Sequence, residues 1–571
     1  MVSAFFRSLS VPSTTPSRRS FVAFSVLAGV GLPVLAGCDL PGASKGKDSA
    51  SANGSASAKG KAKAGSTDWQ KLDAHIMGHN VTVEVSPVIR KNDTTSIMAL
   101  ELTRAKDDAS IDRVKTDSSD TEDNKFNISS YLGTPSIYRP GTGASLVKLL
   151  DLGSGRVWSA TDGSGADDGF LEITPGEKTT SYLSFGKVDT DTVTVMVPMA
   201  GFTTVSVLEA DAAKKASIDL DAASSNLDQF PDAATELAKP ATIERYTRAL
   251  DDSTSTHTGD KDVTVTLASD VTFASDSADL TPAADTQLQT VADQLDQYPD
   301  GGTLTIVGHT DDVQDDAYNQ TLSEKRANAV KTKLQQLTKL DKWNPTTTGK
   351  GESEPRVKDT TDEARAANRR VEITLTPTGG TNPKDSNTTA TPSSSSGSGG
   401  GKLPDPQGPV AKGPEGITLT SKDTDTSSKV TITLDHLTRQ DGYLLGTITC
   451  AIKDGSTGAP LHPLLEDPQT LLANQRDEDG SALPTFNASD GLTLIAGGER
   501  IFPADYLDAD AEHHLPLTEL NISDHLKTGT TTICTIWPDP GGDTIALDHP
   551  DGKYAVKDTA YRLTDIPIKN S

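Results

Sequence analysis

The residues best suited to bind a charged ligand are an aspartate and an arginine, Asp311 and Arg326, fifteen positions apart. Asp311 closes a motif that runs Gly, His, Thr, Asp from residue 308. An aspartate and an arginine that face one site can hold a ligand with an ammonium and a carboxylate on one carbon, because arginine binds carboxylates through two parallel hydrogen bonds. Such a ligand is an amino-acid centre. The alternative is that Asp311 and Arg326 pair with each other or cap local backbone.

The elements around this pair are predicted to place it at the end of a strand and on a helix. Residues 303 to 307 are rich in β-branched side chains and are followed by glycine, which predicts a strand that ends just before Asp311. Thr321 and Glu324 have the spacing of a capping box ahead of apolar residues at helical intervals. We therefore expect Arg326 in the first turns of a helix.

The surrounding segment alternates strands with helices, an order that predicts helices packed on one face of a small mixed sheet. The predicted strands are 263–273, 303–307, 346–350 and 370–375, and the predicted helices are 282–298 and 322–340.

A series of motifs occurs in order through this segment: Phe273 with Ser277-Ala278, Gly308-His309-Thr310-Asp311, Asn319 with Leu322-Ser323, Arg326-Ala327 with Val330, Gly349-Lys350-Gly351-Glu352-Ser353 with Pro355, and Arg365-Ala366-Ala367-Asn368-Arg369-Arg370-Val371-Glu372-Ile373. With these motifs, residues 270 to 375 resemble the OmpA-like carboxy-terminal domain, a peptidoglycan-binding module also found in lipoproteins and flagellar stators. The resemblance covers about a fifth of the chain.

The resemblance implies that Asp311 and Arg326 hold the diamino acid of the peptidoglycan stem peptide, the first by its amino group and the second by its carboxylate. Asn319 and Arg369 fall on positions that line the same pocket, and Thr310 is a further candidate. The resemblance favours His309 as a packed strand-end residue.

Gln314 departs from the family pattern, which usually has a glycine three residues after the motif aspartate. A glycine there would permit a positive φ. We therefore expect the loop after Asp311 to follow another path, without a change to the main pair.

The amino terminus is predicted to be a signal peptide over residues 1–37. Its apolar run is short and ends in Leu35-Ala36-Gly37-Cys38, which resembles the lipobox of bacterial lipoproteins. This motif predicts lipidation of Cys38 and a membrane anchor on the extracytoplasmic face. Arg18 and Arg19 resemble a twin-arginine export motif, and the general secretory route is the alternative.

Charge divides the chain into a basic start and an acidic remainder. The net charge is -27, but residues 1 to 67 hold eight Lys or Arg and two Asp. The acidic balance and the 5% aromatic content exclude a nucleic-acid partner. Residues 38–67, rich in Gly, Ala, Ser and Lys, are predicted to be a disordered tether.

The rest of the chain is predicted to be multidomain, with the α+β OmpA-like region at 263–376 flanked by two β-sandwich-like domains. Short alternating strands predict these domains at 68–210 and 416–571. Residues 211–262 are predicted to be a connector with helical fragments such as 241 to 250. Residues 377–415, rich in Thr, Ser and Gly, are predicted to be a disordered linker.

Two cysteines remain besides Cys38. Cys450 and Cys534 both lie in β-like runs, and in an exported protein we predict that they form a disulfide. The alternative is two separate buried thiols.

No catalytic motif, metal site or cofactor site is predicted. The densest acid and histidine cluster, at residues 508 to 514, lacks metal-ligand spacing. We therefore predict a lipid-anchored envelope protein whose partners are the stem peptide and the membrane. The alternative is an adhesin or assembly factor whose sandwich domains bind a protein or polysaccharide.

Overall fold

The computed structural model describes residues 64–108, 125–133, 143–161, 171–222, 237, 239–358, 360–381, 403–422, 427–452, 458–466, 488–507, 514–522, 525–526, 528–551 and 558–571. The predicted signal peptide, Cys38 and most of the predicted tether lie outside these residues, as do residues 382–402 of the predicted linker. In the described part of the chain, no helix is long and apolar enough to cross a membrane. The chain is mostly sheet, with several parts that are described in turn.

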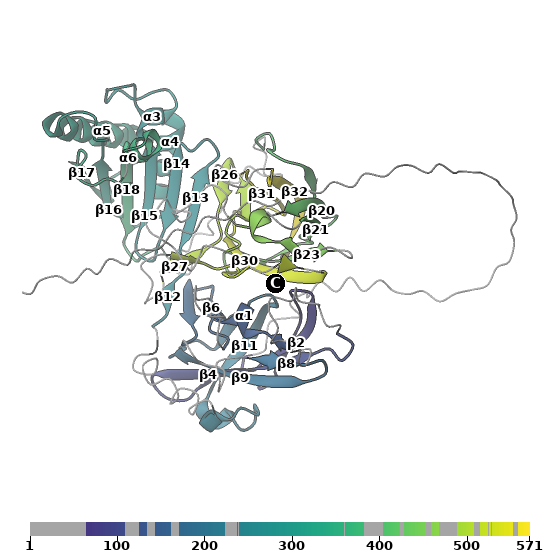
Figure 1. Ribbon diagram of the computed structural model, residues 1–571. Coiled ribbons are helices and arrows are strands. Elements are labelled where there is room, and N and C mark those ends of the chain that lie inside the picture. The colour runs from purple at the N-terminus through teal and green to yellow at the C-terminus, as the bar shows by residue number, and fades with distance from the viewer. Residues whose placement is uncertain are drawn as a thin grey trace, which may run out of the picture. The chain divides into compact units, whose positions relative to one another are not determined.

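The first sheet is built from strands before residue 243, in the order β1-β2-β4-β3-β11-β10-β6-β7-β12, and β9 pairs with β4 (Figure 1). Alternate side chains of β2 point into the core, as the valine pattern predicts. The elements are β1 Gln70–Ile76, β2 His79–Val85, β3 Val88–Arg90, β4 Thr95–Arg104, β5 Phe126–Asn127, α1 Ser129–Leu132, β6 Lys148–Asp151, β7 Arg156–Ser159, β8 Glu172–Ile173, β9 Lys178–Gly186, β10 Thr192–Val197, β11 Gly201–Glu209, η1 Ala210–Ala212 and β12 Ala241–Thr242.

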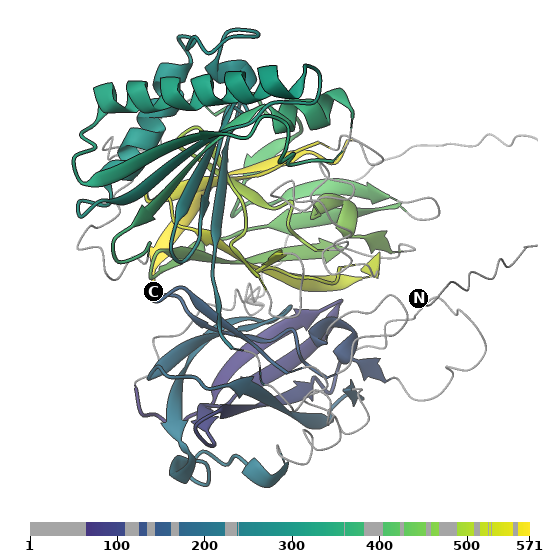
Figure 2. The same cartoon turned by 90° about the vertical axis from the view of Figure 1, so that its left-hand side faces the viewer.

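The middle of the chain forms a mixed sheet in the order β17-β16-β18-β15-β14-β13. Only β16 and β17 run parallel, because the helix α5 crosses over between them. Apolar residues of α4 and α5 pack against this sheet, and the long α5 runs across it in Figure 2. The elements are β13 Arg245–Ala249, β14 Thr254–Thr258, β15 Val263–Ala268, α3 Ser269–Thr272, α4 Ala284–Asp296, β16 Gly302–Gly308, α5 Asp316–Leu337, β17 Trp343–Gly349, α6 Asp362–Asn368 and β18 Arg370–Pro377.

The last part of the chain returns to strands, ordered β26-β25-β31-β32-β22-β23-β21-β20, with β19 on β32 and β30 on β23. The elements are β19 Val410–Lys412, β20 Ile417–Lys422, β21 Ser427–Thr433, β22 Leu437–Gln440, β23 Tyr443–Ile452, β24 Ala459–Pro460, η2 His462–Leu464, β25 Thr493–Ala496, β26 Glu499–Ile501, β27 Asp505–Leu507, β28 His514–Pro516, β29 His525–Leu526, β30 Gly529–Pro538, β31 Thr544–His549 and β32 Tyr561–Asn570.

Hydrogen bonds join the middle sheet to the last one. β13 pairs with β26, with Thr247 opposite Ile501. The helix expected at residues 241 to 250 is therefore wrong: this stretch holds β12 and β13, because pairing on both sides of β13 overrides its helical propensity. Another strand, β19, lies inside the segment expected to be a linker and pairs with β32.

The predicted disulfide is also wrong, because Cys450 and Cys534 are both free and buried. They lie on the paired strands β23 and β30, where Cys450 is opposite Thr531 and Cys534 is opposite Thr447. This offset of three positions puts the thiols on opposite faces of the sheet. Each thiol belongs to a different apolar core.

Candidate functional site

Two glycines allow α5 to pack closely on the sheet and so fix the position of Arg326. Gly308 ends β16 and pairs with Gly349 at the end of β17. A Cβ atom at Gly308 would collide with the carbonyl oxygen of Ser323, and one at Gly349 would collide with the Ser323 hydroxyl. The predicted strand end before Asp311 is confirmed, and its glycine is needed for close approach of the helix.

The helix α5 begins at Asp316, six residues earlier than expected. Its N-cap is Asp315, whose carboxylate accepts a hydrogen bond of 2.9 Å from the backbone N–H of Tyr318. Thr321, expected to belong to the cap, lies inside the helix and donates to the carbonyl oxygen of Ala317. Arg326 is therefore in the interior of α5.

Arg326 is only 5% exposed. The group lies 5.1 Å from the ring centre of Phe273, and its Nε donates to the Ser277 carbonyl at 3.0 Å. Burial lowers the pKa of Arg326, although the carboxylates of Asp270, Asp276 and Asp311 act in the opposite direction. Among the described residues, neither terminal nitrogen of this guanidinium has a hydrogen-bond partner.

Asp311 does not pair with Arg326 in the part of the chain that the structure describes. Its partner is Arg369, whose Nη1 lies 2.7 Å from Asp311 Oδ2. The same guanidinium binds Asp270 through two further contacts, 2.7 Å from Nε and 2.6 Å from Nη2. The Asp311 side chain is 14% exposed.

A second arginine fixes the loop that carries Asp311. Arg365, one helical turn before Arg369, donates from Nε to Asp312 at 2.8 Å. This hydrogen bond lowers the pKa of Asp312. The two arginines thus hold two successive aspartates from the same side of α6.

The Asn319 side chain holds the same loop by hydrogen bonds to its backbone carbonyls. Its buried Nδ2 lies 3.2 Å from the Asp311 carbonyl, 3.1 Å from the Gln314 carbonyl and 2.6 Å from a Glu352 carboxylate oxygen. Gln314 is not among the residues with positive φ. The loop therefore closes without the family's glycine.

Thr310 and His309 are buried at the strand end. The backbone N–H of Thr310 donates to the Gly351 carbonyl at 2.9 Å, and its hydroxyl has no hydrogen-bond partner in the described part of the chain. His309 Nε2 lies 3.7 Å from Glu372 Oε2, too far for a hydrogen bond, which fits a packed residue.

Glu372, which neighbours His309 and Arg370, is ionised at neutral pH. Burial raises the pKa of Glu372, but the neighbouring His309 and Arg370 outweigh burial and hold it at about 2. Arg370 Nε donates to Glu372 at 2.7 Å.

Sequence reasoning did not single out Asp270 or Asp276, which contribute two of the carboxylates near Arg326. Ala268 pairs with Arg370, and Asp270, two residues after Ala268 in α3, thereby lies beside Arg369. Only the strand register could have identified Asp270, since nothing in the local sequence distinguishes it.

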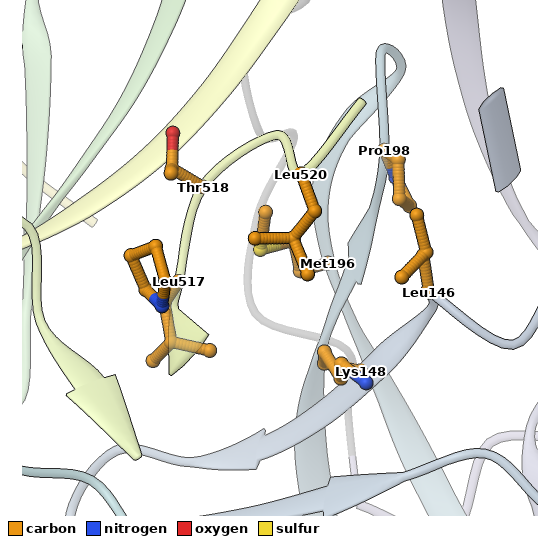
Figure 3. Close-up of a pocket in the computed structure, with 8 residues that line it drawn as sticks. Leu146, Lys148, Met196, Pro198, Leu517, Thr518 and Leu520 are labelled. Carbon is orange, nitrogen blue, oxygen red and sulfur yellow. The ribbon is translucent and has the colours of Figure 1, made fainter. Parts of the chain in front are cut away.

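Two cavities of the described structure lie away from this charged site. One, lined by Leu146, Met196 and Leu520 among others, encloses about 10 Å³ and is shown in Figure 3. A second, lined by residues of β10, β11, β22 and β23, encloses about 40 Å³. Such volumes hold water rather than an organic ligand. Among the described residues, no His, Cys, Asp and Glu side chains form a group that could hold a metal ion.

Asp311, Arg326 and Arg369 lie in the part of the chain that matches known proteins. Residues 272–369 match the model of the OmpA family. The putative lipoprotein YfiB of Escherichia coli (strain K12) is 36% identical over 111 residues, which are 19% of this chain and 68% of that protein. The chain belongs to the OmpA family.

Other relatives match the same part of this OmpA-family chain. The probable lipoprotein YiaD of Escherichia coli is 37% identical over 21% of this chain and 54% of that protein. Outer membrane porin F of Pseudomonas aeruginosa is 43% identical over 18% of this chain and 29% of that protein. The chain thus spans only about a third to a half of the length of the first curated relatives it matches. The crystal structure of the peptidoglycan-associated lipoprotein from Burkholderia pseudomallei is 27% identical, with a TM-score of 0.17, over 18% of this chain and 87% of that one.

Proposed function

We propose that this chain is a lipid-anchored cell-envelope protein that binds peptidoglycan non-covalently through the diamino acid of the stem peptide. The observation that carries the proposal is the buried guanidinium of Arg326, which has two terminal nitrogens without a hydrogen-bond partner among the described residues. A buried cation of this kind favours an anionic ligand group, because its burial is costly until a carboxylate is bound.

The ligand would bind as a zwitterion. Its carboxylate would accept hydrogen bonds from the terminal nitrogens of Arg326, and its ammonium would donate to the carboxylate of Asp311. The fork of a guanidinium matches a carboxylate in shape as well as charge. Thr310 contributes a buried hydroxyl at the same strand end. Asn319 and Arg369 would act mainly by holding the loop that carries Asp311.

We also infer roles for the amino terminus and for the sheets that flank the charged site. Cys38 would carry the lipid, and residues 38–67 would form the tether between the membrane and the folded part. The sheets on either side of the OmpA-family region would be β-sandwich-like domains. The names of two relatives, both lipoproteins, support the anchor.

Binding to purified sacculi tests the proposed function. We expect Asp311→Ala and Arg326→Ala each to weaken co-sedimentation about tenfold or more, because a hydrogen bond to a charged group contributes about 1.5 to 3 kcal/mol. Asp285→Ala is the matched control, since it removes an exposed ion pair between α4 and Lys333 of α5. Circular dichroism of each variant separates lost binding from lost folding.

Wild-type co-sedimentation by both folded variants would overturn the proposed site. Undiminished binding after deletion of residues 263–376 would instead favour the flanking sheets as the binding surface and support an adhesin or assembly factor.

A further inference from the structure

Arg369 stands between two carboxylates that come from different elements. It follows α6, while Asp270 lies in α3 and Asp311 lies in the loop after β16. Its Nε and Nη2 bind the two oxygens of Asp270, and its Nη1 binds one oxygen of Asp311. The three side chains form a linear network at the edge of the site.

The two contacts of Arg369 are unequal. The contact with Asp270 uses the Nε and Nη2 edge in a bidentate fork, which is the stronger geometry. The hydrogen bond to Asp270 is also the largest cause that raises the pKa of Arg369. The contact with Asp311 uses a single nitrogen and a single oxygen, so Arg369 is held mainly by Asp270.

The second oxygen of Asp311 therefore has no cationic partner among the described residues. Its only described contact is the backbone N–H of Val313, at 3.4 Å, which is long for a hydrogen bond. If Asp270 were neutral, the freed edge of Arg369 could turn to Asp311 and occupy both oxygens. An ammonium group would then have to displace a bidentate ion pair.

We propose that Asp270 is a positioning residue that holds Arg369 away from one oxygen of Asp311 and so keeps that oxygen available to the ammonium of the ligand. This inference rests on the proposed function, because it assumes that Asp311 receives the ammonium of a diamino acid.

The backbone supports this role independently of the side chains. The N–H of Ser269 donates to the carbonyl of Arg369 at 3.0 Å, and Ala268 pairs with Arg370 in the sheet. Asp270 and Arg369 are thus brought together by the pairing of β15 with β18. The Asp270 side chain is 54% exposed, so a neutral substitution there removes charge without opening the core.

A double-mutant cycle tests the inference. The probe is a synthetic stem tripeptide that ends in meso-diaminopimelate, titrated calorimetrically into the full chain. We expect Asp270→Asn to weaken binding about fivefold, and Asp270→Glu to recover most of the loss. Arg369→Gln removes the competing cation, so Asp270→Asn should have no further effect in that background.

Three results would overturn the inference. If Asp270→Asn binds the tripeptide with wild-type affinity, Arg369 needs no restraint by Asp270. If adding Asp270→Asn to Arg369→Gln lowers the affinity as much as it does in the wild-type chain, Asp270 acts by a route that does not involve Arg369. In both cases wild-type binding and its loss in Asp311→Ala would leave the proposed function intact. Failure of the wild-type chain to bind the tripeptide would overturn the proposed function together with the inference.

Discussion

Arg326 is a buried cation that no described carboxylate neutralises by direct contact, although three aspartates lower the cost of its charge from a distance. The residue types allow Asp311 and Arg326 either to share a ligand or to pair with each other, and only the family resemblance favours the shared ligand. The partners of the two side chains in the structure could not be predicted in this way: Asp311 binds Arg369, and Arg326 binds the Ser277 carbonyl. These partners depend on strand register and on the start of α5, which no local pattern specifies.

A second buried charge, far along the chain, gives a pH-dependent prediction. Glu519 accepts hydrogen bonds from the backbone N–H groups of Met199 at 2.8 Å and Cys534 at 3.0 Å. Burial raises the pKa of Glu519 to about 7, although these hydrogen bonds lower it. The folded chain therefore holds the proton more tightly than the unfolded chain does.

We expect the stabilising contribution of Glu519 to be complete below about pH 4.5 and to be lost as the pH rises toward 7. Between pH 5 and pH 7.5, the wild-type chain should lose on the order of 2 kcal/mol more stability than Glu519→Gln, which keeps an acceptor oxygen. Thermal unfolding of both proteins at the two pH values measures this difference. Parallel pH dependence of the two proteins would show that Glu519 does not titrate in this range.

At the scale of elements, the order of strands and helices in the OmpA-family region is largely predictable, but the start of α5 is not. Two candidate N-cap residues, Asp315 and Thr321, lie six positions apart. The earlier one is used, and the extra first turns of α5 carry Asn319 and Gln320, whose side chains donate to the Asp311 and Gly349 carbonyls. Tertiary packing thus decides between two locally acceptable caps.

The two patterns give a discriminating pair of variants. Asp315→Ala should destabilise the first turn of α5 by about 1 kcal/mol, because the N–H of Tyr318 loses its acceptor. Thr321→Ala should change stability by less than about 0.5 kcal/mol, because Thr321 is an exposed interior helix residue. Hydrogen exchange of the amides from residue 316 to residue 325 measures both effects. Faster exchange in Thr321→Ala alone would place the cap where the sequence pattern puts it.

At the scale of the molecule, sequence patterns predict a mostly sheet, multidomain chain but miss how its parts are connected. β13 pairs with β26, about 250 residues away, and the N–H of Gly78 donates to the carbonyl of Thr530 at 2.9 Å. Cys450 and Cys534 remain free for a related reason: the register of β23 on β30 places the two thiols on opposite faces of the sheet. Pairings between distant segments leave no trace in local composition or periodicity.

We propose that Asp311 and Arg326 together recognise a carbon that bears both an ammonium and a carboxylate. The most direct measurement is calorimetric titration of the full chain with two stem tripeptides, one ending in meso-diaminopimelate and one ending in lysine. Lysine has no carboxylate on the carbon that bears its free ammonium, so only diaminopimelate can pair with both residues.

We expect the wild-type chain to bind the diaminopimelate tripeptide at least about tenfold more tightly than the lysine tripeptide. Arg326→Gln should remove this preference, while Asp285→Asn should keep it. Equal affinity of the wild-type chain for the two tripeptides, or an unchanged preference in Arg326→Gln, would show that Asp311 and Arg326 do not recognise the ligand together.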